Sequence, residues 1–170
     1  MNNGSLEFVR ALVVEGARTH CANSNSDTPL ILASWFGLLG IVDFLLAQHL
    51  EPTENLLGDH FAYDHCNLDG NRAVELAVLG GHLSCLRALV DAGASIIPTK
   101  SNKYSALHIS SHQRDLEITR FLLAHGASVE WTNEKGWTPL HALAVGYEAN
   151  DRTAGHLSDL YALLVKARKA

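Results

Sequence analysis

A short motif recurs at a fixed interval along the chain, and this periodicity restricts the fold more than any other feature of the sequence. The stretch TPLH begins at Thr138, SALH begins at Ser105, and TPLI begins at Thr28. Ser105 and Thr138 are 33 residues apart, and one more step of that length back from Ser105 reaches Arg72. A period of about 20 to 50 residues indicates a tandem array of small units rather than one globular core.

Each unit is predicted to contain two short antiparallel helices. The Thr or Ser that opens the motif is a favourable N-cap, and Pro29 and Pro139 occupy the first helical position, where proline is well tolerated. The second helix of a unit carries apolar residues at helical spacing, as in Leu116, Ile118 and Phe121. One helix pair cannot bury such a stripe alone, so neighbouring units are expected to stack on each other.

Glycines recur in step with these helices. Gly37 and Gly81 fall where the chain should reverse between two helices, and further glycines fall where the second helices should end, at Gly16, Gly93 and Gly126. Two departures put the local geometry in question. Residues 72–75 read RAVE in place of the start motif, and Arg114 stands where a reversing glycine is expected.

The register divides the chain into a half unit and four full units. The half unit comprises residues 4–27, because SLEFVRALVVEGAR matches only the second half of a unit. The full units are predicted at 28–71, 72–104, 105–137 and 138–167, with insertions at about 50–66 and about 147–155. Together they are expected to form one domain over residues 1–170.

Composition excludes several classes of protein. No apolar run approaches the roughly 18 to 20 residues that a membrane helix needs. Three cysteines are too few for a disulfide framework, which favours the cytosol or the nucleus. The 13 Lys and Arg are scattered against 18 Asp and Glu, a formal net charge of -5, so direct nucleic-acid binding is not expected. We expect a monomer.

The units resemble ankyrin repeats, in which a Thr-Pro-Leu-His helix start is joined to a Gly-Ala turn and a projecting hairpin. The resemblance rests on TPLH at Thr138, on its partial copies, and on the GAS endings after Gly93 and Gly126, and it covers nearly the whole chain. It implies an all-α solenoid of about four and a half repeats, with helix-turn-helix units and projecting β-hairpin loops. It also implies a non-catalytic protein-protein interaction module without a cofactor, which binds a protein or an extended peptide on its concave side.

The concave side in this family is formed by the hairpins and the first helices. All three tryptophans map to it by register, and aromatic side chains with a polar group are enriched in binding hot spots. The predicted contact residues are Trp35, Phe36, Asp69, Asn102, Tyr104, His112, Gln113, Trp131, Lys135 and Trp137. Any single exposed aromatic could instead cover a neighbouring loop, and scattered surface apolar residues are ordinary.

Two other interpretations of the function remain open. The chain could be a regulatory segment of a larger enzyme, channel or adaptor, as the opening half unit suggests. It could also hold zinc, because His20-Cys21 and His65-Cys66 map to adjacent hairpins. Successive side chains of an extended strand point to opposite faces, which argues against convergence of all four.

Two kinds of reactive side chain are given structural roles. His108 and His141 of the helix starts recur without a nucleophile or carboxylate at fixed spacing, so they are expected to make structural hydrogen bonds. Cys85 falls at a core position of a second helix and is expected to be buried. No catalytic residue is predicted.

Overall fold

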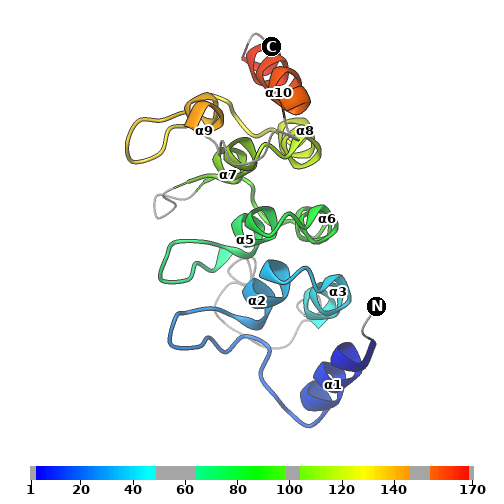
Figure 1. The fold of residues 1–170 in the computed structure, drawn as a ribbon. Helices are drawn as coiled ribbons and strands as arrows, with labels where there is room; N and C mark the ends of the chain where they lie inside the picture. Colours follow the sequence, from blue (N-terminus) through cyan, green and yellow to red (C-terminus); the bar gives the residue numbers. More distant parts are fainter. Residues whose placement is uncertain (1–2, 49–63, 99–103, 146–153, 169–170) are drawn as a thin grey trace. The chain divides into compact units, whose positions relative to one another are not determined.

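A computed structural model describes residues 3–48, 64–98, 104–145 and 154–168. Within these ranges the chain is helical and contains no strand, and the helices follow one another in pairs joined by turns and longer loops (Figure 1). The predicted all-α class and its helix-turn-helix units are confirmed. The chain forms two compact units, residues 1–94 and residues 95–170.

The first unit contains five helices among its described residues. They are α1 (Asn3–Val14), α2 (Pro29–Trp35), α3 (Leu39–Gln48), α5 (Ala73–Leu79) and α6 (Leu83–Asp91). Helices α2 and α3 form one antiparallel pair and α5 and α6 form the next, and α2 packs on α5 while α3 packs on α6. The buried apolar residues between them include Val42, Leu45, Val74, Leu86 and Leu89.

The second unit repeats this plan with four helices among its described residues. They are α7 (Ala106–Gln113), α8 (Leu116–Ala124), α9 (Pro139–Val145) and α10 (Ala154–Ala167). Helix α7 packs on α9, and α8 packs on α10. The buried apolar residues between them include Leu107, Ile118, Leu122, Leu143 and Leu160.

The helix starts are specified by side chains, as the motif predicts. The Thr28 hydroxyl accepts a hydrogen bond from the amide of Ile31 at 3.3 Å, and the Ser105 hydroxyl accepts one from the amide of His108 at 3.4 Å. Asp115 caps α8 in the same way, through a 2.9 Å bond from the Ile118 amide. These bonds satisfy amides that the first turn of a helix leaves without an intrahelical acceptor.

The RAVE start of α5 keeps the helix by a different device. Arg72 and Glu75 are both fully buried, and the guanidinium donates to Glu75 at 3.0 Å and 2.6 Å. Its remaining nitrogen forms an ion pair with Asp64 at 3.0 Å. Burial lowers the pKa of Arg72, but the hydrogen bonds and charges of Glu75 and Asp64 raise it further, so the side chain stays protonated.

Arg114 likewise preserves the turn in which it replaces a glycine. Its backbone adopts the left-handed conformation, with φ 58° and ψ 33°, and its amide donates to the Ser111 carbonyl at 3.2 Å. The reversal between α7 and α8 is therefore made by a residue that adopts this conformation only at a cost in energy.

Three loops are closed by an asparagine five residues before a helix start, a feature that the sequence analysis did not identify. The Asn23 side-chain oxygen accepts from the amides of Asn25 and Asp27, both at 2.9 Å. Asn67 and Asn133 make the same pair of bonds, at 3.1 and 2.9 Å and at 2.9 and 2.9 Å respectively. We call these three residues the loop asparagines.

The predicted insertion at 50–66 and the one at 147–155 lie largely outside the described residues.

Candidate partner-binding surface

An exposed apolar surface lies at the ends of the first helices of the first unit. Trp35 ends α2 and is 38% exposed, and Phe36 follows it and is 64% exposed. Leu32, one turn earlier in α2, and Leu79, the last residue of α5, are also exposed. Leu79 stands seven residues after Arg72, as Trp35 stands seven after Thr28, so the two residues hold the same place in successive repeats. We call these four residues the apolar surface.

His82 fixes the backbone under the apolar surface. Its Nε2 lies 3.1 Å from the Trp35 carbonyl oxygen and forms a hydrogen bond with it. A side chain at Gly37 would place its Cβ 2.5 Å from the His82 ring, and one at Gly80 would come equally close. Gly37 also has φ +68°, so both the conformation and the close approach require glycine there.

Adjacent loops of the first unit are tied together. The Asn67 side chain donates to the Asp27 carboxylate at 2.9 Å, and His65 Nε2 lies 2.9 Å from the Ser26 carbonyl oxygen. The hydrogen bond from Asn67 is the main cause that holds the pKa of Asp27 below its usual value, although burial raises it. Asp69 lies exposed at the tip of the second of these loops.

His108 organises the corresponding region of the second unit. Its Nδ1 lies 2.7 Å from the Ser105 hydroxyl, and its Nε2 lies 2.7 Å from the Trp137 carbonyl oxygen. A carbonyl only accepts, so Nε2 carries the proton and Nδ1 accepts from Ser105. Burial lowers the pKa of His108, and the bond to the Trp137 carbonyl only partly opposes this. The predicted structural role of His108 is confirmed, and His141 pairs with Thr138 in the same way at 2.8 Å.

Two aromatic residues belong to this region, and one of their rings contacts His108. The Tyr104 ring meets the His108 ring edge-on, with centroids 6.3 Å apart, and Tyr104 is exposed. The indole of Trp137 is half-buried, and the Lys135 ammonium lies 5.5 Å from its centroid, within the range of a cation-π contact. Trp137 also closes its own loop, because its amide donates to Asn133 at 2.9 Å. The tryptophan beside the helix start thus has a main-chain role as well as an available ring.

The other predicted contact residues are placed as follows. Trp131 is half-buried, and His112 and Gln113 lie exposed at the end of α7. Asn102 lies outside the described residues. Trp35, Phe36 and Asp69 belong to the first unit, and Tyr104, His112, Gln113, Trp131, Lys135 and Trp137 belong to the second. That the two groups form one contact surface stays a prediction.

Leu32 and Leu79 were missed by the sequence analysis, which looked for aromatic side chains. The signal that could have found Leu79 is the register itself, since it holds the place of Trp35. In the second unit the same place is taken by His112 and Val145.

The two His-Cys pairs do not gather into a metal site among the described residues. Cys21 is exposed, His65 is bound to the Ser26 carbonyl, and the Cys66 thiol lies 3.6 Å from the Asp64 carbonyl oxygen. No group of three or more His, Cys, Asp or Glu in the described ranges could hold an ion. Cys85 is buried as predicted, and burial, together with the charge of Asp43, raises the pKa of its thiol.

Stacked helix pairs with capped starts and turn-closed loops define a tandem-repeat protein. A family model described as ankyrin repeats in three copies matches residues 1–100 and 76–152. The chain therefore belongs to the ankyrin repeat family, whose members are generally non-catalytic interaction modules.

Curated relatives match parts of larger or differently built proteins. The chain is 29% identical over 140 residues to the nuclear factor NF-kappa-B p105 subunit of Gallus gallus, a match over 81% of this chain and 13% of that protein. It is 33% identical over 79 residues to human protein phosphatase 1 regulatory subunit 27, covering 46% and 51%. It is 32% identical over 123 residues to the probable 26S proteasome regulatory subunit p28 of Saccharomyces cerevisiae, covering 71% and 50%. The chain thus spans about half or less of each of these relatives.

Proposed function

We propose that the chain is a non-catalytic module that binds another protein or an extended peptide through its loops and first helices. The observation that carries the proposal is the exposure of the apolar surface, whose members Leu32, Trp35, Leu79 and Phe36 are 38%, 38%, 39% and 64% exposed. Contiguous apolar side chains on a surface mark interaction sites, and tryptophan is prominent among hot-spot residues.

The second unit contributes polar and aromatic contacts to this function. The Tyr104 ring contacts the His108 ring, the Trp137 carbonyl bonds to His108, and Lys135 adds a positive charge next to the Trp137 indole. We expect neither nucleic acid nor a membrane as the partner, and we expect the cytosol or the nucleus as the compartment. None of the described helices has the length and apolarity required to cross a bilayer.

Truncation of the tryptophans tests the proposal. A protein retained by the wild-type chain from an extract of the source cell is identified and purified, and its Kd is measured by titration. Trp35→Ala and Trp137→Ala are each expected to weaken binding by about 2 kcal/mol, roughly 30-fold, because a desolvated indole contact is lost. Val14→Ala, which truncates an exposed apolar residue of α1, is the matched control and should leave Kd unchanged.

The affinities can be interpreted only for variants that are folded. Circular dichroism must first show that each variant is folded, which is expected because both indoles retain solvent exposure. Equal affinity of the wild type and both tryptophan variants would then contradict the proposal.

A second candidate function is regulation within a larger protein or assembly. Two of the relatives are regulatory subunits by name, and another is the transient receptor potential cation channel subfamily A member 1 homolog of Caenorhabditis elegans. A reading frame from the source genome that extends past the present chain into a catalytic or channel domain would favour this function over that of a separate adaptor.

A further inference from the structure

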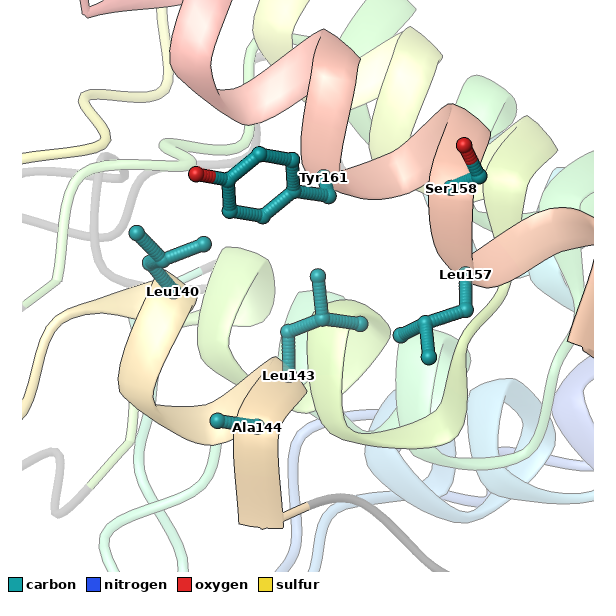
Figure 2. Close-up of a pocket in the computed structure, with 6 residues that line it drawn as sticks. All are labelled: Leu140, Leu143, Ala144, Leu157, Ser158 and Tyr161. Carbon is teal, nitrogen blue, oxygen red and sulfur yellow. The ribbon is translucent and has the colours of Figure 1, made fainter.

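One side of the last described repeat is exposed, although the corresponding side of the preceding repeat is buried. Within the second unit, residues of α9 and α10 line an apolar groove of about 460 Å³, shown in Figure 2. Its lining residues are Leu140, Leu143, Ala144, Leu157, Ser158 and Tyr161. Leu107 and Ser111, which hold the places of Leu140 and Ala144 one repeat earlier, are fully buried, whereas Ala144 is exposed.

The histidine of the last helix start gives an independent sign of the same open side. His108 is 1% exposed and binds the Trp137 carbonyl of the following repeat. His141 holds the same place in α9, is exposed, and bonds only to Thr138 among the described residues. The groove therefore continues the stacking interface by which α7 packs on α9 and α8 packs on α10.

Helix α1 also exposes apolar residues whose counterparts in later repeats are buried. Phe8 and Leu12 of α1 are 65% and 44% exposed. Their counterparts in later second helices are buried, since Cys85 and Ile118 hold the place of Phe8 and are 1% and 0% exposed. Phe8 and Leu12 are four residues apart, so they lie on one face of α1 and form an apolar ridge.

In place of the monomer expected from the sequence, we propose that the α1 ridge of one molecule docks in the α9–α10 groove of a second copy, so that copies associate head to tail. The occupant is argued from shape and chemistry: the groove lies between two helices and is lined by Leu, Ala and Tyr, which suits a single helix with an apolar ridge. Each face is also the kind that repeats bury when they stack. The interface is heterologous, so a molecule with both faces intact can join a neighbour at each end.

Complementary single variants test the proposal. Phe8→Glu places a charge on the ridge and Tyr161→Glu places one in the groove, at residues 65% and 56% exposed and hence not needed for folding. Wild-type mass, measured by sedimentation velocity and by light scattering after gel filtration, is expected to rise with concentration beyond that of a dimer. Phe8→Glu keeps the groove but no copy of it has an intact ridge, and Tyr161→Glu keeps the ridge but no copy of it has an intact groove. Each variant alone is therefore expected to remain a monomer. Their equimolar mixture is expected to give a 1:1 dimer and nothing larger.

The controls separate this association from the proposed partner surface. Ile97→Glu changes an exposed apolar loop residue outside both faces, and Trp35→Ala changes the apolar surface. Both should associate like the wild type, and salt should have little effect because the contact is apolar. A wild-type chain that is monomeric at every concentration overturns the proposal. So does a mixture of the two variants that stays monomeric, or a Tyr161→Glu chain that associates like the wild type.

Discussion

The loops before the helix starts place one residue in the left-handed conformation, two positions before the N-cap. Gly70 and Gly136 occupy this place with φ 80° and 72°, and Ser26 occupies it in the first loop with φ 59°. A non-glycine residue is strained there, although glycine costs more backbone entropy on folding. The balance between these two effects can be measured.

Ser26→Gly is expected to stabilise the chain by about 0.5 to 1 kcal/mol, because the strain removed exceeds the entropy added. The measurement is the midpoint and slope of urea unfolding. Gly136→Ala is the reciprocal change and is expected to destabilise by about 1 kcal/mol or more. A Ser26→Gly protein less stable than the wild type would show that the serine side chain contributes more than its backbone costs.

At the start of α5 a buried ion pair takes the place of a side-chain cap, and the stability of the chain depends on both of its members. Arg72→Ala leaves the Glu75 carboxylate buried without the cation that compensates it, so a loss of about 3 to 5 kcal/mol in unfolding free energy is expected. Replacing both residues, as Arg72→Thr with Glu75→His, recreates the pairing of Thr138 with His141 and should recover most of that loss. Urea unfolding of the single and double variants measures both effects. A single variant within about 1 kcal/mol of the wild type would mean that the carboxylate takes up a proton or finds water instead.

His108 of α7 bonds to the Trp137 carbonyl in the loop before α9, and this buried histidine should make the stability of the second unit fall at acid pH. Burial keeps the pKa of His108 below the ordinary value of 6.5. The unfolded chain therefore takes up the proton at a higher pH than the folded chain does. The stability due to neutral His108 is complete above that ordinary value and is lost as the pH falls below it.

This acid sensitivity is measured as a difference between proteins, since the chain has 10 histidines. Between about pH 7.5 and about pH 5.5, unfolding free energy should fall more steeply for the wild type than for His108→Gln, whose amide cannot take up a proton in this range. Equal slopes for the wild type and His108→Gln would show that folding does not change the pKa of His108, which would contradict this prediction.

Over the whole molecule, the elements that could be predicted from the sequence are those determined by residues close to them in the chain. A cap, a proline at the first helical position and a reversing glycine each act within a few residues, so the helices and the burial of Cys85 follow from the register. The structural role of His108 follows almost as directly, because the helix-start histidine recurs one period apart, whereas the main-chain hydrogen bonds of Trp137 were not predicted.

The remaining features depend on residues distant in the sequence or on what a repeat lacks. The ion pair at Arg72 needs Asp64, which belongs to an insertion without a counterpart in the other repeats. The apolar surface depends on the register neighbour Leu79, and Phe8 is exposed although Cys85 and Ile118, which hold its place in later repeats, are buried. No periodic pattern encodes these circumstances, because they are exceptions to the period.

The loop asparagines carry a consequence for how such a protein could acquire new specificities. Each one accepts from two backbone amides of its own loop, and that pair of bonds uses no side chain from the first two tip positions. The three tips accordingly read Ser-Asn-Ser at 24–26, Leu-Asp-Gly at 68–70 and Glu-Lys-Gly at 134–136, which are neutral, acidic and of mixed charge. Randomised libraries confined to the first two letters of each tip would diversify recognition while the scaffold beneath them stayed unaltered.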